Sequence, residues 1–303
     1  MNSTGAASSI DDIDARPGST TSLLRTVIAT YLRPLGGWIG TAALIRLLED
    51  AGVPAPRTRT AVVRVKAKGL LRSEARDGVP GYAVAEDAHP MLVRAHQRIH
   101  HPRWMRLGDR WCLISFSIPE ELRDVRHQLR RRLRYIGCGT VSAALWIVSE
   151  YLVDEVEEIL EELGVREHCA LFLADEVRGV DDLPAAVRRW WDLTELGTLH
   201  REFLDRHAEE IRSRPATLAS ATAFGLWTRA LDRWRIIPYN DPGLPAELLP
   251  ADWPGLRATP LFFTVRDEVA PLAAEHVRAV TGRPGPLPDH FEECAHVAVP
   301  RTA

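Results

Sequence analysis

The chain has 303 residues, and its 38 lysines and arginines against 41 aspartates and glutamates give a net charge of −3. With 46% hydrophobic and 26% charged residues, it has the composition of a globular protein large enough for two or three domains. This composition excludes a protein that binds nucleic acid with its whole surface, so such a partner would need a local basic patch. It also argues against a membrane protein, because no apolar run approaches the ~20 residues of a membrane span.

The N-terminal segment lacks the basic and apolar regions of a secretory signal. We therefore expect residues 1–20 to form a flexible, slightly acidic tail. The four cysteines lie far apart and form no C-x-x-C pair, which favours a reduced, cytoplasmic location. No motif indicates a cofactor.

The first ordered region predicts a DNA-binding fold. Apolar residues at helical spacing indicate a helix that ends near Pro34 and a second that ends at Gly52. A third helix is expected over Thr58–Lys68, closed by Gly69, and two strands, Leu70–Ser73 and Gly81–Ala85, can pair around the turn-rich ARDGVP. Three helices followed by a hairpin predict a winged helix-turn-helix, and we assign it to residues 21–90.

The third helix and its flanks are strongly basic. Residues 57–76 hold seven lysines and arginines against one acid, Glu74. One helix face is apolar through Ala61, Val62 and Val65, so the basic residues can face away from the domain. A solvated basic helix is the alternative interpretation, but its position as third helix before a hairpin favours DNA. The predicted DNA-binding residues are Arg57, Thr58, Arg59, Thr60, Arg64, Lys66, Lys68 and Arg72.

A linker over residues 91–103 separates this region from a middle domain, which we place at residues 104–180. Strand and helix patterns alternate there as β-α-β-α-β, an order that suggests a ferredoxin-like fold. Its first helix carries six arginines between Arg123 and Arg134, behind acids in the first turn. Helix-dipole complementarity accounts for that arrangement, and contact with a phosphate of DNA or of a ligand is the alternative.

Residues 181–282 are expected to form a mostly helical C-terminal domain, and residues 283–303 an irregular, proline-rich tail. Four tryptophans of the helical part have two interpretations, core packing or the lining of an apolar ligand pocket. They are Trp190, Trp191, Trp227 and Trp234. The whole chain is therefore predicted to be an α+β protein.

Other possible sites have weak signals. His96 and His100 are four residues apart and His101 follows, but no Glu stands between them and no Cys or Asp completes a metal site. A surface or linker role is the better interpretation. GCG at residues 137–139 lacks the third glycine of a dinucleotide-binding motif and indicates a turn or the entry to a strand.

Four segments resemble the PaaX family of bacterial transcriptional regulators. YLRPLGGWIGTAALIRLLEDAGV resembles the family's first two helices, and RTAVVRVKAKGLL its recognition helix. RWCLISFSIPEELRDVRHQLRRRLRYIGCGTVSAALWIVS resembles its middle domain, and WRIIPYNDPGLPAELLPADWPG its C-terminal signature. The wing sequence DGVPGYAV departs from the basic, aromatic wing common in the family, which predicts fewer phosphate contacts there.

The resemblance implies a dimeric repressor of a catabolic operon, with a winged helix, a Cas2-like middle domain and a helical C-terminal domain. It implies binding to double-stranded DNA at an inverted-repeat operator and release by an aryl- or acyl-CoA thioester. Alternatives are an activator of the same fold and a Cas2-like metal-dependent nuclease. The nuclease interpretation is disfavoured, because the first strand of the middle domain has no acid and the nearest, Asp109, precedes it. The effector pocket, the operator and the regulated genes stay open.

Overall fold

A computed structural model describes residues 16–215 and 217–283. Most of the predicted N-terminal tail and all but one residue of the predicted C-terminal tail lie outside this range. The chain divides into two compact units. Unit 1 comprises Met1–His101, Phe203–Arg235 and Arg257–Ala303, and unit 2 comprises Pro102–Glu202 and Ile236–Leu256. The C-terminal third of the sequence thus contributes to both units.

Unit 1 begins with the three helices that the periodicity predicts. They are α1 (Thr20–Val27), continued by a π-helical turn over Ile28–Leu32, α2 (Thr41–Asp50) and α3 (Ala55–Ala67). The helix α3 starts three residues before the predicted Thr58, because Pro54 and Pro56 favour the first turn of a helix. It ends as predicted at Gly69, whose φ of +74° is a conformation that other residues rarely adopt.

Unit 1 also contains a three-stranded antiparallel sheet in the order β1-β3-β2, whose first strand lies between α1 and α2 in the chain. Its strands are β1 (Trp38–Gly40), β2 (Leu71–Arg76) and β3 (Val79–Val84). The predicted hairpin is present but longer than expected, since pairing runs up to Arg76 and Val79 around a tight turn at Asp77 and Gly78. β1 was not expected, because a three-residue strand that follows Gly37 and ends in Gly40 carries almost no strand signal.

Helices from later in the sequence complete the core of unit 1. They are α4 (His89–His100), the part of α8 (Leu193–Arg212) from Phe203 onward, α9 (Ser220–Trp234) and most of α11 (Gly255–Thr281). Residues 91–103, expected to be a linker, are therefore largely helical. Trp234 stacks on Phe262 with ring centroids 4.5 Å apart, and both Trp227 and Trp234 are buried. Their interpretation as core residues is confirmed.

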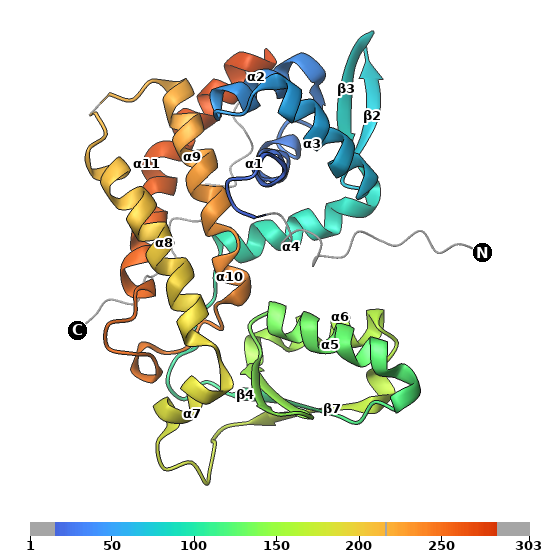
Figure 1. Cartoon of the computed structure of the whole chain (residues 1–303), viewed down its shortest axis with the longest axis vertical. Coiled ribbons are helices and arrows are strands. Elements are labelled where there is room, and N and C mark those ends of the chain that lie inside the picture. Colours follow the sequence, from blue (N-terminus) through green and yellow to red (C-terminus); the bar gives the residue numbers. More distant parts are fainter. Residues whose placement is uncertain (1–15, 216, 284–303) are drawn as a thin grey trace. The chain divides into compact units, whose positions relative to one another are not determined.

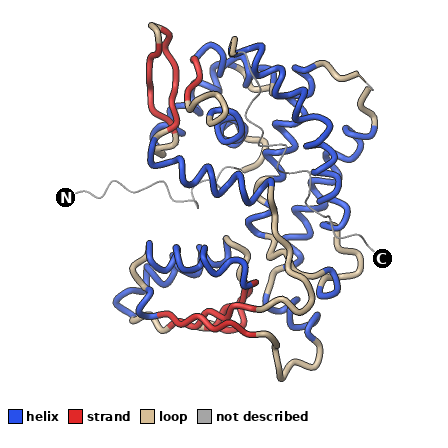
Figure 2. Tube along the Cα trace, turned by 180° about the vertical axis from the view of Figure 1, so that it is seen from behind, coloured by secondary structure: helices blue, strands red, loops and turns tan. Residues whose placement is uncertain are grey.

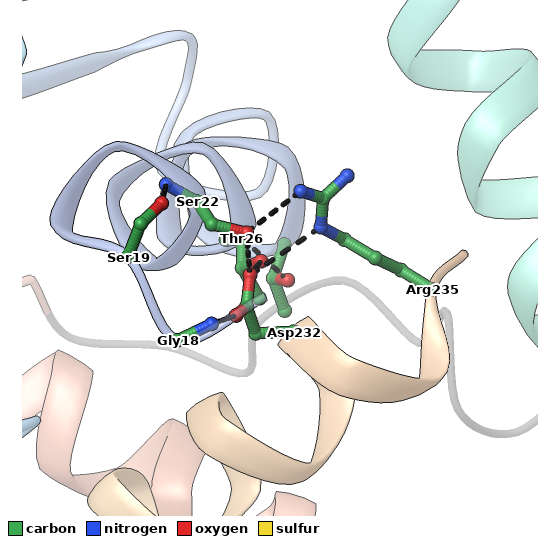
Figure 3. A network of polar contacts seen from close by, with 7 residues as sticks. Gly18, Ser19, Ser22, Thr26, Asp232 and Arg235 are labelled. Atoms are coloured by element: carbon green, nitrogen blue, oxygen red, sulfur yellow. Dashed lines mark hydrogen bonds and ion pairs between the residues drawn. The ribbon is translucent and has the colours of Figure 1, made fainter. Parts of the chain in front are cut away.

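A buried polar network joins α1 to α9 (Figure 3). The carboxylate of Asp232 accepts hydrogen bonds from the hydroxyls of Ser22 (2.5 Å) and Thr26 (2.9 Å) and from the backbone N–H of Gly18 (2.6 Å). Arg235, also buried, lies 3.4 Å from the same carboxylate and donates to the Ser22 hydroxyl at 2.9 Å. The network links residues more than two hundred positions apart in the sequence.

Unit 2 is built on a four-stranded antiparallel sheet in the order β5-β6-β4-β7. Its elements follow the chain order β-α-β-β-α-β of a split βαβ fold, and α5 and α6 lie together on one side of the sheet (Figures 1 and 2). The predicted single strand region 137–149 is a hairpin of two strands. The elements are β4 (Trp111–Phe116), α5 (Arg123–Tyr135), β5 (Gly139–Ser142), β6 (Leu145–Ser149), α6 (Val153–Glu162) and β7 (Cys169–Ala174).

The rest of unit 2 packs on this sheet through a second core, in which Trp191 is central. This core is formed by α7 (Leu183–Trp190), the start of α8 and the turn Ala246–Leu248 against β4 and β6. The same unit contains α10 (Ile237–Asn240), whose Tyr239 stacks on Tyr135 of α5 with ring centroids 4.8 Å apart. The Trp191 indole N–H donates to the carbonyl of Gly137 at 2.8 Å. A Cβ on Gly139 would lie 2.6 Å from the same indole, so Trp191 can pack here only because residue 139 is glycine. The G-x-G motif thus forms the surface on which Trp191 packs, which we call the seat of Trp191.

Candidate nucleic-acid interface

The helix α3 divides into a buried face and an exposed face. Ala61, Val62 and Val65 are buried, as their spacing predicts. Thr58 is also buried, with no exposed surface, because it lies one turn before Val62. The prediction that Thr58 contacts DNA is therefore corrected: its side chain belongs to the packed face.

The remaining predicted residues are all on the surface of unit 1. They are Arg57, Arg59, Thr60, Arg64, Lys66, Lys68 and Arg72. Arg57, Thr60 and Arg64 come together at a hollow of about 530 Å³, whose other side is formed by residues 18–21 at the start of α1. Within the described part of the chain, neither Arg57, Arg59 nor Arg64 forms an ion pair. These three guanidinium groups are thus available for an anionic partner.

In contrast to these three arginines, the cations at and near the hairpin after α3 have polar partners. Lys66 donates to the Ser73 hydroxyl at 2.6 Å, which ties α3 to β2. Arg72 and Arg76 both form ion pairs with Glu74, the latter at 2.5 Å. The hydrogen bond from Arg76, with a smaller contribution from Arg72, holds the pKa of Glu74 below its ordinary value. The carboxylate therefore stays ionised and offsets part of the positive charge of the hairpin.

One residue of the exposed face was missed by the sequence analysis. Val63 is 67% exposed, one helical turn after Arg59 and next to Arg64. An exposed valine on a basic helix could contact the methyl group of a thymine base. The helical spacing indicates that Val63 lies on this face, since it follows Arg59 by four residues. A prediction based on charged residues alone does not include it.

The basic helix of unit 2 uses most of its arginines internally. Arg126 pairs with Glu120 at 2.7 Å, Arg132 pairs with Glu162, and Arg130 donates to the carbonyl of Ala143 at 2.8 Å. The Arg134 guanidinium lies over the Trp146 ring. These contacts support the structural interpretation of this helix for the arginines that make them.

The structure also bears on the metal and nuclease alternatives. The rings of His96 and His100 are 4.7 Å apart, but no set of three or more metal-binding side chains gathers within residues 16–215 and 217–283. Asp109 is exposed and accepts a hydrogen bond from the backbone N–H of Arg106 at 2.7 Å.

Among the helices of the described ranges, none has the length and apolar character needed to cross a membrane.

An exposed basic helix, fixed by an apolar face and followed by a hairpin, is the arrangement typical of helix-based nucleic-acid-binding proteins. Three family models match in succession: the PaaX-like protein over residues 19–88, the PaaX protein central Cas2-like domain over residues 105–186, and the PaaX-like protein C-terminal domain over residues 191–279. The chain belongs to the PaaX family of regulators.

Two proteins show how far the similarity extends. The transcriptional repressor PaaX of Escherichia coli (strain K12) is 26% identical over 271 residues, which cover 88% of this chain and 85% of the relative. The solved structure of the uncharacterized protein Rv0674 from Mycobacterium tuberculosis has a TM-score of 0.56 and 22% identity, covers 86% of this chain and 98% of its own, and supports the fold. The similarity to a repressor places the chain among regulators and not among enzymes.

Proposed function

We propose that this protein is a transcriptional repressor that binds double-stranded DNA through a winged helix formed by α1–α3 and the β2–β3 hairpin. The observation that carries the proposal is the similarity, over most of both chains, to a protein named as a transcriptional repressor. The basic, exposed face of α3 supports it independently, because the chain as a whole is slightly acidic.

In this proposal α3 enters the major groove with its exposed face toward the bases. Arg59 and Arg64 are the candidates for base recognition, since a guanidinium group can bond to both acceptors of a guanine. Arg57 and Thr60 share the hollow with Arg64, and Val63 adds an apolar contact. Lys66, Lys68 and Arg72 lie where the backbone phosphates would pass and would supply salt-dependent affinity.

The protein is proposed to act as a homodimer on an inverted repeat. Two copies related by a two-fold axis would place their recognition helices in successive major grooves, ~34 Å apart. The proposed signal is an aryl- or acyl-CoA thioester that releases the protein from DNA. The name of the relative favours repression over activation of transcription.

The test is Arg64→Ala, measured by fluorescence anisotropy on a duplex that the wild-type protein selects from a random-sequence library. We expect a loss of ~1–3 kcal/mol in binding free energy and relaxed selectivity at one base pair. Lys66→Ala should instead weaken binding about equally on all sequences.

Arg206→Ala is the control, because Arg206 is an exposed arginine on α8, outside the proposed surface. An Arg64→Ala protein that binds its selected duplex like the wild type, with unchanged selectivity, contradicts the docking of α3. A wild-type protein that enriches no sequence contradicts the proposed function itself.

A further inference from the structure

A groove of about 770 Å³ lies within unit 2, and none of the residues proposed to bind DNA lines it. The end of α7, the start of α8 and residues 250–254 form most of its wall, and Arg134 and Thr140 complete it. Its volume is in the range of sites that hold small molecules, about 300–1,000 Å³. Neither the DNA contacts nor the family comparisons assign it a role.

Tryptophans give this groove flat apolar surfaces. Trp191 is buried and held in place by its hydrogen bond to Gly137 and its contact with Gly139. Trp253 is also buried, its ring edge-on to that of His200, which in turn lies 3.1 Å from the Asp241 carboxylate. Trp190 is only half-buried. A partly exposed indole beside two fixed ones is a surface on which a planar group can stack.

Four arginines line the same groove. Arg188 and Arg189 lie in the last turn of α7, Arg201 lies two turns into α8, and Arg134 belongs to α5. In the described ranges none of the four pairs with a carboxylate. Arg201 donates to the Thr198 hydroxyl, and Arg134 lies over the Trp146 ring. Guanidinium groups without carboxylate partners around an aromatic surface are suited to bind carboxylate or phosphate.

Three acids also line the groove and offset most of the positive charge of its arginines. The Asp192 carboxylate accepts from the backbone N–H of Glu195 and so caps the start of α8. Glu195 and Asp252 lie on the wall as well. Four arginines against three acids leave the charge only slightly positive, so charge alone is a weak basis for binding. A ligand that stacks on the indoles and also carries an anion uses both features of the groove.

We propose that this groove is the effector site of the regulator, and that its ligand combines a planar apolar group with a carboxylate or phosphate. The proposal rests on the proposed function, because it assigns a place to the signal that would release the protein from DNA. An aromatic acid and its CoA thioester share this chemistry, and the experiment distinguishes them.

The experiment is isothermal titration of the full-length protein with benzoyl-CoA, CoA and benzoate. In the CoA-thioester case benzoyl-CoA binds more tightly than CoA, which lacks the aryl group; in the aromatic-acid case benzoate binds by itself. We expect the double variant Arg188→Ala/Arg189→Ala to weaken binding of the preferred probe roughly tenfold or more, which corresponds to about 1.4 kcal/mol. Trp190→Ala should weaken it as well, with Trp190→Phe keeping most of the affinity.

Arg206→Ala, an exposed arginine on the same helix as Arg201 but outside the groove, should bind the probe like the wild type. Thermal unfolding of each variant without ligand checks that it is folded. If both the arginine and the tryptophan variants bind the probe like the wild type, the groove is not the effector site. The proposal that the protein binds such an effector is then retained. If no probe binds the wild-type protein although it still binds its selected DNA, the proposed ligand class is overturned and the repressor function is not.

Discussion

Glu74 is the one acid between Arg57 and Arg76, and it lies between Arg72 and Arg76 on β2. Its carboxylate pairs with Arg72 and Arg76, and the Arg76 guanidinium also lies over the Trp38 ring at 5.6 Å. The hairpin therefore presents fewer unpaired cations than its sequence contains. The wing sequence already predicts few phosphate contacts. The ion pairs of Glu74 give a second, physical reason to expect only weak electrostatic attraction between β2 and DNA.

We predict that Glu74→Gln strengthens DNA binding at low salt. The change removes a negative charge and releases Arg72 and Arg76 to reach phosphates, so the plot of log affinity against log salt should steepen by about 0.9 for each new phosphate contact. Anisotropy titrations at several salt concentrations measure this slope. Glu49→Gln, an exposed glutamate on α2, is the control. Weaker binding by Glu74→Gln would mean that Glu74 is needed mainly to keep the hairpin in shape.

At the scale of elements, the contact between α1 and α9 depends on a buried charge. Asp232 and Arg235 have side chains only 1% and 7% exposed, and the hydroxyls of Ser22 and Thr26 complete their hydrogen bonds. A buried carboxylate is tolerated only when it is fully paired in this way. The same arrangement leaves little freedom in how α1 packs on α9.

We predict that Asp232→Asn lowers the free energy of unfolding by ~3–5 kcal/mol, because it removes the buried negative charge that faces the Arg235 guanidinium. Urea unfolding followed by circular dichroism measures the loss. Glu209→Gln is a matched control, since Glu209 pairs with Arg212 at the same i,i+3 spacing but is 71% exposed. That control should change stability by less than ~1 kcal/mol. Equal effects of the two changes would show that burial of the Asp232 pair is unimportant.

The elements differ in how well the sequence predicts them. The helices α1–α3 and the alternation of strands and helices in unit 2 were predictable, because apolar periodicity and proline or glycine stops are local signals. The helix α4 was not predicted, since residues 91–103 were expected to be a linker. The exposed basic face of α3 followed from the same periodicity. The strand β1, the Asp232 network and the seat of Trp191 on Gly139 were not predictable, since each depends on a partner far away in the sequence. Thr58 was misplaced because a polar residue was assumed to be exposed.

At the scale of the whole molecule, unit 1 is assembled from distant parts of the chain. Besides the Asp232 network, His276 of α11 lies 2.8 Å from the Asp50 carboxylate of α2, and Arg283 donates to the carbonyl of Leu35. Tyr31, fully buried, packs against Phe224 of α9 with ring centroids 5.7 Å apart. The N-terminal helices therefore share one core with helices that follow residue 202.

We predict that a fragment of residues 1–101 does not fold by itself, since it would expose the apolar faces of α1 and α2 that α9 and α11 cover. The expected result is the absence of a cooperative thermal transition and of DNA binding. Adding a fragment of residues 203–303 in trans should restore part of both. A cooperative melt and sequence-specific binding by the isolated fragment would contradict the shared core.

The shared core has a consequence for biosynthesis. At ~5–20 residues per second, the ribosome releases α1 to α3 many seconds before it completes α9 and α11, which come more than a hundred residues later. During that interval the helices proposed to read DNA have no finished core, and their apolar faces are open to chaperones or to other nascent chains. The proposed capacity to read DNA would therefore arise only after α11 has been synthesised, so a product of translation that ends before α11 could not occupy an operator.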